Sequence, residues 1–197
     1  MFLFTLVLAV ICGWLRGGRL FRLSRLPLRW VLVLPVPFII RSLLLNARVG
    51  DAGFLEAWAP WLQSVAYGLL VLLAVVNRHL PGSSYLLAGT GANALVIVAN
   101  GGRMPVSEAA IHIAARDAER GVALNTLLAE QSLTHELLTP DTRLPWLADI
   151  IPLPHPFPFP SVASPGDVLI ALGLFWFIVS SMGTRRDREA GDAASAA

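Results

Sequence analysis

Apolar residues in this chain gather into five long runs instead of alternating or recurring at helical spacing in short amphipathic stretches. The runs lie near residues 1–15, 30–47, 58–77, 83–102 and 168–184. Only the second run holds a charged side chain, Arg41. A helix that crosses about 30 Å of hydrocarbon needs about 20 residues, and backbone left unpaired in lipid is costly. The pattern therefore predicts an all-α, polytopic membrane helix bundle with about five transmembrane helices, of which the first is short.

The arginines predict the orientation of this bundle. One set of connectors carries Arg16, Arg19, Arg22, Arg25, Arg29, Arg78, Arg185, Arg186 and Arg188. The opposite connectors carry fewer arginines, and these are interspersed with most of the acidic residues. Cytoplasmic connectors are enriched in Lys and Arg, so we expect the N-terminus outside and the C-terminus in the cytoplasm. The first run has no basic residues before it and no small-residue cleavage site, which favours a span over a signal peptide.

The five runs divide the chain into a single membrane domain and a tail. The membrane domain comprises residues 1–184 and includes an outer segment, 103–167, that we expect to be helical and then Pro-rich. Ser107 is a candidate N-cap for a first helix, and a second is expected over 124–133. Prolines are concentrated between residues 140 and 165, and their alternation over 152–160 predicts extended, polyproline-like backbone. Residues 185–197 are polar and Ala-rich, which predicts a disordered cytoplasmic tail.

Composition agrees with a membrane class. Hydrophobic residues make up 55% of the 197 residues and charged residues only 14%, which excludes disorder and is untypical of soluble domains. The net charge of +2 is too small to indicate a nucleic-acid partner. The single cysteine, Cys12, excludes an intramolecular disulfide. The expected partner is therefore the lipid bilayer.

Polar residues inside spans are costly and mark candidate functional positions. In the fourth run, Thr90, Asn93 and Asn100 share one helical face that is surrounded by Gly and Ala. Two interpretations stay open for this face. It is either a close helix–helix contact in which the Asn side chains form hydrogen bonds, or part of a ligand or ion path.

Four arginines are candidates for binding an anion near the outer headgroup plane. Arg41 and Arg48 share a face of the second run, and Arg103 and Arg143 lie in the outer segment. Asn100, Gly101 and Gly102 precede Arg103, and the paired glycines can expose backbone amides to an anion. The alternatives are that Arg41 extends to the headgroups, that the glycines end a helix, and that Arg103 forms a salt bridge with Asp149.

No catalytic motif is present. His135-Glu136 lacks the second His of a zinc-protease motif, and there is no G-x-S-x-G sequence. The histidines are too scattered in sequence to predict a metal site, and no cofactor is predicted. Enzyme activity is therefore not supported, although it is not excluded.

Several segments resemble those of a known family. They are Asn100-Gly-Gly-Arg-Met-Pro-Val106, Leu137-Leu-Thr-Pro-Asp-Thr-Arg-Leu144, Asp149-Ile-Ile-Pro152 and Pro165-Gly-Asp-Val-Leu-Ile-Ala-Leu-Gly173. They resemble a family of small bacterial integral membrane proteins catalogued only as a domain of unknown function. The resemblance covers most of the chain and is strongest over 93–173. It implies about five helices in the bacterial inner membrane, and it carries no known activity or ligand.

Two functions are consistent with these features. The first is an accessory or structural subunit of a membrane complex, which would use the small-residue face of the fourth span and the Pro-rich segment to dock other subunits. The alternative is a protein that binds or translocates an anionic lipid-like molecule at the outer leaflet. Its candidate ligand-binding residues are Arg41, Arg48, Asn93, Asn100, Gly101, Gly102, Arg103, Arg143 and Asp149.

Overall fold

The computed structural model describes residues 1–47, 53–114, 132–154, 157 and 161–183, and most of these residues are helical. The α-helices are α1 (Phe2–Leu15), α2 (Pro35–Asn46), α3 (Phe54–Val76), α4 (Ser83–Ala99), α5 (Glu108–Ala114) and α7 (Pro165–Met182). Three short 3₁₀ helices join them, namely η1 (Leu20–Arg25), η2 (Val31–Val33) and η4 (Pro145–Leu147).

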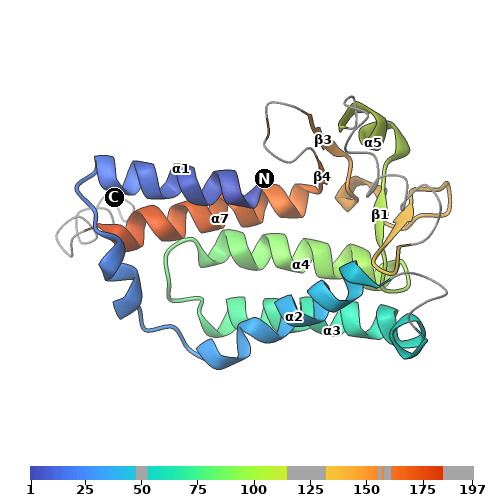
Figure 1. The fold of residues 1–197 in the computed structure, drawn as a ribbon, viewed down its shortest axis with the longest axis horizontal. Helices are drawn as coiled ribbons and strands as arrows, with labels where there is room; N and C mark the ends of the chain where they lie inside the picture. Colours follow the sequence, from blue (N-terminus) through green and yellow to red (C-terminus); the bar gives the residue numbers. More distant parts are fainter. Residues whose placement is uncertain (48–52, 115–131, 155–156, 158–160, 184–197) are drawn as a thin grey trace.

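Five helices lie side by side along the long axis of the molecule (Figure 1). Contacts between neighbours give the order α1, α7, α4, α3, α2. The chain reverses direction from each of these helices to the next in sequence (Figure 1). The described strands and α5 therefore lie at the end of the molecule toward which the N-terminal end of α1 points, and we call it the sheet end. Residues 16–34 and the α3–α4 connection lie at the opposite end, which we call the arginine end.

Among the residues that the structure describes, two helices are long and apolar enough to cross a membrane, α3 with 23 residues and α7 with 18. At 1.5 Å per residue they are about 35 Å and 27 Å long. The other apolar helices are shorter: α1 has 14 residues, α2 has 12 and α4 has 17. We expected about five helices that cross the membrane, and two of the described helices are long enough to do so.

The second apolar run is not one continuous helix. Trp30 has a left-handed backbone with φ 57°, and a 3₁₀ turn precedes α2. Helix α2 begins at Pro35, so Pro35 and Pro37 occupy its first turn. Backbone N–H groups in a first turn have no partner within the helix, and the missing N–H of proline therefore costs little there.

The prediction of an all-α fold is wrong in the outer segment, where two small sheets form. Strand β1 (Met104–Val106) pairs in parallel with β2 (His135–Leu137). Strand β3 (Ile151–Leu153) pairs antiparallel with β4 (Ser161–Ala163). Both β1 and β3 contain a proline, and a residue that precedes proline prefers extended backbone.

The helical part of the outer segment is confirmed in part. Ser107 caps α5, because its Oγ accepts a hydrogen bond from the Ala110 amide at 3.3 Å. The second helix expected over 124–133 lies almost wholly outside the described residues, and so does the expected tail, 185–197. The first two residues of the stretch 152–160 are extended as expected, but they belong to strand β3 rather than to an isolated polyproline segment.

Glycines let α4 and α7 approach closely. A Cβ at Gly89 would lie 2.8 Å from Ile170, and one at Gly173 would lie 2.8 Å from Leu86. A Cβ at Gly166 would overlap the side chain of Asn93. The small-residue face of the fourth run therefore packs against α7 of the same chain.

Large apolar side chains are exposed along the outer faces of the helices. Trp61 on α3 is 69% exposed, Phe38 on α2 is 58% exposed and Trp176 on α7 is 57% exposed. Of the most apolar window of each long helix, only 28% of α3 and 33% of α7 is buried. Core helices of soluble proteins bury most of their apolar surface, so these two helices lack the packing expected of such cores.

Candidate functional site

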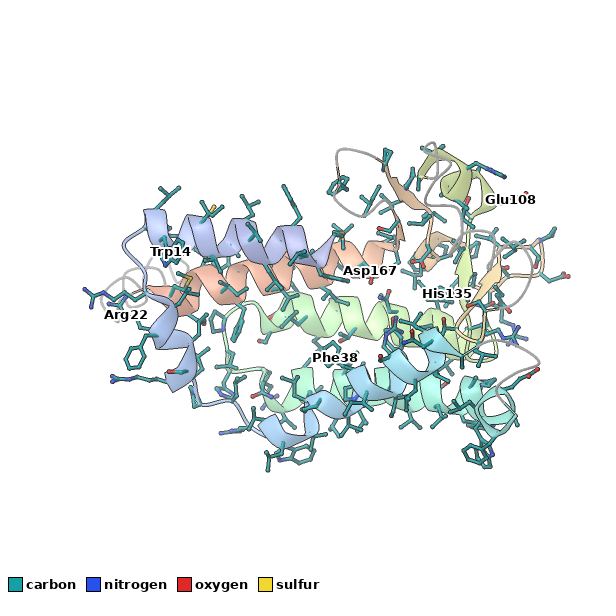
Figure 2. All side chains as sticks on the ribbon, in the orientation of Figure 1. Trp14, Arg22, Phe38, Glu108, His135 and Asp167 are labelled. Atoms are coloured by element: carbon teal, nitrogen blue, oxygen red, sulfur yellow. The ribbon has the colours of Figure 1, made fainter. Side chains whose placement is uncertain are left out.

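Buried polar side chains gather at the sheet end, where α2, α3, α4 and α7 meet β2. We call them the polar cluster: Arg41, Gln63, Tyr67, Asn93, Thr134, His135, Asp149, Ser164 and Asp167. Figure 2 shows His135 and Asp167 toward this end of the molecule, while Arg22 lies at the other. Among these side chains, Gln63, Thr134 and Ser164 are 0% exposed. A buried polar group without a partner is costly, so the hydrogen bonds of the cluster show which of its groups are structural.

One side of the cluster, between α4 and α7, is a closed hydrogen-bond network. Asn93 accepts a hydrogen bond from Ser164 Oγ at 2.9 Å and donates to Asp167 Oδ1 at 2.8 Å. Ser164 and Asp167 also form a capping box that starts α7, with bonds of 2.9 Å and 3.2 Å. Asn93 therefore joins α4 to the start of α7 through its single amide group.

The other side of the cluster lies between α3 and the sheet. Gln63 Nε2 donates to the Thr134 carbonyl at 2.8 Å. Thr134 Oγ1 is 2.7 Å from His135 Nδ1, and His135 Nε2 is 3.9 Å from Asp149 Oδ2. The backbone of Asp149 is held by β1, since its amide donates to the Pro105 carbonyl at 2.9 Å. Backbone bonding thus positions the carboxyl group at the inner edge of the sheet.

Two acceptor atoms on this side have no hydrogen-bond partner among the described residues. They are Oε1 of Gln63 and Oδ1 of Asp149, and both are buried. Gln63 precedes Tyr67 by four residues on α3, so the two side chains share a helix face. The α3–sheet side of the cluster therefore presents hydrogen-bond acceptors that the described protein does not satisfy.

Arg41 acts electrostatically on the α3–sheet side of the cluster. Its guanidinium lies over the Tyr67 ring, 4.8 Å from the centroid, a cation–π contact. Its charge acts on both His135 and Asp149. Among the described residues, no carboxylate lies within ion-pair distance of Arg41. Arg41 is half-buried, so this charge is only partly screened by solvent.

Burial shifts the titration of the two ionisable groups beside the sheet. Burial, reinforced by the positive charge of Arg41, lowers the pKa of His135 to about 4. Burial, followed by repulsion from Asp167, raises the pKa of Asp149 well above its ordinary value, and Arg41 opposes this shift only partly. His135 is therefore neutral at pH 7, and its contact with Asp149 is not a full ion pair.

The order hydroxyl, imidazole, carboxyl in Thr134, His135 and Asp149 is that of a catalytic triad, but the geometry differs. The Thr134 side chain is fully buried, and 3.9 Å is too long for a hydrogen bond between His135 and Asp149. Among the described residues, no three His, Cys, Asp or Glu side chains are close enough together to hold a metal ion. The cluster is therefore better suited to binding a polar group than to nucleophilic chemistry.

The structure assigns Asn100, Gly101 and Gly102 to the end of α4. Gly101 has φ +66° and the Gly102 amide donates to the Ile97 carbonyl at 2.8 Å, which is a Schellman C-cap. Asn100 donates to the Arg143 carbonyl and accepts from the Arg143 amide, each at 2.8 Å. Of the two interpretations of this stretch, the geometry favours the helix end, because the Gly102 amide is already bonded.

The remaining candidates are not gathered around one point. Arg143 is exposed and Arg103 is half-buried, and the charge of Arg103 acts on Glu136. The expected salt bridge between Arg103 and Asp149 is not formed, because Asp149 faces His135 instead. Arg48 lies outside the described residues. Of the predicted site residues, the structure thus brings Arg41, Asn93 and Asp149 into one cluster.

Several members of the cluster were not predicted as site residues. Gln63 and Tyr67 lie at helical spacing in an otherwise apolar run, and that spacing could have identified them. His135 was not proposed as a site residue because no metal-binding partner is near it in sequence. The approach of β2 to α3 depends on long-range pairing, which local patterns do not reveal.

Comparison with known proteins identifies the family. The sequence model of DUF5317, described as a family of unknown function, matches residues 25–179. The chain belongs to the DUF5317 family. This confirms the expected membership of a family without an assigned function, and the DUF5317 match covers the whole polar cluster. An uncharacterized protein of Thermotoga maritima is 26% identical over 178 residues, which cover 90% of this chain and 88% of that protein. No solved structure matches the chain.

Proposed function

We propose that this chain is a multi-pass protein of the bacterial inner membrane, with its N-terminus and the segment 103–167 outside. Helices α3 and α7 are long enough to cross, and the exposed apolar faces of the bundle suit lipid. The arginines concentrated at the arginine end suit a cytoplasmic location. The shorter helices α1, α2 and α4 would cross with local thinning of the bilayer and with their flanking residues at the interface.

Within this membrane, we propose that the polar cluster binds the headgroup of an anionic lipid-like molecule at the outer leaflet. The observation that carries this function is Arg41, a half-buried guanidinium with no carboxylate at ion-pair distance among the described residues. A guanidinium can form paired hydrogen bonds with a phosphate. The exposed apolar faces of α2 and α3 would hold the acyl chains. Movement of the lipid between leaflets is a further prediction of the same hypothesis.

The two unpaired acceptors of the cluster restrict which headgroups can bind. Gln63 Oε1 and Asp149 Oδ1 can only be satisfied by a hydrogen-bond donor, although a protonated Asp149 can itself donate. A headgroup that carries hydroxyl or ammonium hydrogens beside its phosphate would supply such donors. Phosphatidylglycerol has this chemistry, and phosphatidylcholine, whose ammonium has no hydrogens, lacks it.

The accessory-subunit function stays a prediction with less support. The small-residue face that we expected to dock another subunit is covered by α7. Most of the Pro-rich stretch beyond β3 lies outside the described residues. The exposed apolar faces do not distinguish a protein partner from lipid.

The test is lipid binding by the purified chain in detergent, measured by native mass spectrometry during titration with phosphatidylglycerol. The Arg41→Gln variant should bind roughly tenfold more weakly, which is the effect of one lost charge-assisted hydrogen bond. Arg41→Lys keeps the charge, so its affinity for phosphatidylglycerol should lie between those of Arg41→Gln and the wild type. Binding by Arg41→Gln equal to that of the wild type would refute the proposed site.

Arg143→Gln is the matched control for this experiment. It removes the same charge at the same end of the molecule, but the Arg143 side chain is exposed and its attraction is screened by water. We expect less than a twofold change in this variant. Equal losses in both variants would indicate diffuse attraction to the sheet end instead of a site at Arg41. Circular dichroism of each variant establishes that the helices are retained.

A further inference from the structure

The arginine end carries a second feature that the proposed headgroup site does not explain. Between α1 and α2 the chain places an arginine at residues 16, 19, 22 and 25, which is a spacing of three, and another at 29. Residues 20–25 form the 3₁₀ helix η1. A 3₁₀ helix has three residues per turn, so Arg22 and Arg25, which lie within η1, share one of its faces. Arg16 and Arg19 precede this helix and Arg29 follows it.

Two of these arginines are used within the protein. Arg22 donates from Nη1 to the Met182 carbonyl at 2.8 Å, which caps the C-terminal end of α7. The guanidinium of Arg25 lies 4.6 Å from the centroid of the Phe21 ring. These contacts attach η1 to the end of the bundle and hold one apolar ring beside a charge.

The three others, Arg16, Arg19 and Arg29, are exposed, and we call them the arginine surface. No acidic residue occurs among residues 1–47, so no carboxylate of this segment neutralises them. The α3–α4 connection also lacks an acid and adds Arg78. The sequence after α7 carries three arginines and three acids, Arg185, Arg186, Arg188, Asp187, Glu189 and Asp192, which leave its formal charge at zero.

The backbone of the arginine surface is anchored to the bundle. The Arg19 amide donates to the Met182 carbonyl at 3.0 Å. The side chain of Asn77, at the end of α3, accepts from the Arg29 amide at 2.8 Å and donates to the Arg29 carbonyl at 3.1 Å. Both ends of the segment are thus fixed to helices that differ in sequence position by about a hundred residues. A fixed array loses less conformational entropy on binding than a flexible loop does.

Exposed apolar side chains lie on the same segment as these charges. Leu15 is 83% exposed, Phe21 is 63% exposed and Trp14 is 56% exposed. Figure 2 shows Trp14 and Arg22 together at this end of the helices. Large apolar and aromatic groups next to guanidinium groups are typical of segments at the boundary between headgroups and acyl chains.

We propose that residues 16–29 form a binding surface for anionic phospholipid headgroups of the membrane leaflet at the arginine end. The arginine surface contacts the phosphates, and Leu15, Phe21 and Trp14 enter the acyl boundary. A nucleic acid or an acidic soluble protein would leave these apolar side chains in water, so the lipid surface fits both kinds of side chain. The proposal requires that the bundle crosses a membrane, but it does not require the headgroup site at Arg41.

The experiment measures lipid selectivity of the full chain in vesicles that contain phosphatidylglycerol and phosphatidylcholine. Spin-labelled lipids report the association of each headgroup with the protein. The wild type should prefer phosphatidylglycerol, and Arg16→Gln/Arg19→Gln should reduce this preference about 25-fold, since each of the two arginines near an anionic surface contributes about fivefold. The preference should also weaken at high salt.

Two further variants separate a specific surface from net charge and from misfolding. Arg103→Gln/Arg143→Gln removes two charges at the sheet end and should leave the selectivity within twofold of the wild type. Arg16→Lys/Arg19→Lys keeps the charges and should retain most of the selectivity. Equal losses in the two Gln variants, or no loss in Arg16→Gln/Arg19→Gln, would overturn the proposal.

Arg41→Gln distinguishes the two binding hypotheses. It should weaken the binding of phosphatidylglycerol at the polar cluster and leave the selectivity of the arginine surface unchanged. If Arg41→Gln binds phosphatidylglycerol like the wild type while Arg16→Gln/Arg19→Gln loses selectivity, the proposed headgroup site is refuted and the proposed arginine surface is supported. The reverse result supports the headgroup site and refutes the surface.

Discussion

The two sides of the polar cluster differ in how fully they satisfy their own polar atoms. Between α4 and α7, the Asn93 amide is bonded to Ser164 and Asp167, and these two also cap a helix. Between α3 and the sheet, Gln63 Oε1 and Asp149 Oδ1 are buried without a partner among the described residues.

This difference indicates a structural role for the α4–α7 side of the cluster and a binding role for the α3–sheet side. A satisfied buried network stabilises a particular helix pairing, and its loss leaves several groups unpaired at once. An unsatisfied acceptor costs stability, and proteins tolerate such costs where a ligand or another function compensates. We therefore expect substitutions on the α4–α7 side to affect folding, and those on the α3–sheet side to affect binding.

The largest expected effect is at the contact between α4 and α7. In Gly89→Leu the new side chain would meet the backbone of Gly166 and the atoms of Ile170, which are 2.8 Å from the position of the Cβ alone. Because backbone cannot move aside as a side chain can, the helices must separate, with a loss of at least 3 kcal/mol, the upper part of the usual range of about 1–3 kcal/mol for overpacking. The measurement is the yield of monodisperse protein by size-exclusion chromatography, which should fall sharply.

Gly91→Leu is the control for this substitution. Gly91 lies two residues further along the same helix, and a Cβ there would meet no atom within 4 Å. The change in helix propensity is the same, so the two variants differ only in the packing against α7. If Gly91→Leu aggregates as strongly as Gly89→Leu, close packing of α4 on α7 is not what stabilises the bundle.

A smaller effect compares the two sides of the cluster directly through Asn93→Leu and Gln63→Met. Asn93→Leu leaves Ser164 and Asp167 without their partner and should reduce the free energy of unfolding by about 2 kcal/mol. Gln63→Met removes an unpaired oxygen, and the Thr134 carbonyl keeps its bond from the Met104 amide at 2.9 Å. Its cost should stay below about 1 kcal/mol.

Thermal unfolding in mild detergent, followed by circular dichroism, measures both variants. Gln63→Met should also weaken phosphatidylglycerol binding. Asn93→Leu should lower this binding only in proportion to the protein that it unfolds. A larger stability loss in Gln63→Met than in Asn93→Leu would contradict the division of the cluster into a structural side and a binding side.

Sequence patterns predicted the parts of this fold that depend on local composition. The apolar runs coincide closely with α1 and α4, and Ser107 was correctly predicted to cap a helix. The expectation that the chain belongs to a family of unknown function is confirmed. Local sequence patterns did not predict the strands, because β1 pairs with β2 across about thirty residues of sequence. Strands of three residues are also too short to show a periodicity.

The candidate site was predicted in part for the same reason. Arg41 and Asn93 were identified because polar groups are conspicuous in apolar runs. Their contact partners lie on other helices: Arg41 contacts Tyr67 of α3, and Asn93 is bonded to Ser164 at the start of α7. The glycines after Asn100 left both a helix end and an anion site open, and the bond from the Gly102 amide to the Ile97 carbonyl favours the helix end.

The smallest expected effect concerns the pH dependence of stability on the α3–sheet side. The folded-state pKa of His135, about 4, is below the ordinary value of 6.5, so the unfolded chain binds more protons between these values. The His135 contribution therefore lowers stability as the pH falls from 6.5 toward 4. The pKa of Asp149 is raised, so the folded chain binds more protons above pH 3.8. The Asp149 contribution lowers stability as the pH rises, which has the opposite sign.

Single substitutions should separate these two contributions. In Asp149→Asn only the His135 contribution remains, and the unfolding temperature should fall more steeply between pH 6.5 and 4.5 than in the wild type. In His135→Gln the slope should become flatter or reverse over the same range. The measurement is the unfolding temperature in detergent at half-unit steps of pH, because it compares slopes within each variant and is independent of their absolute stabilities. Parallel slopes in the wild type and both variants would mean that neither group is buried as the structure has it, and that the acceptors beside Arg41 are already open to solvent.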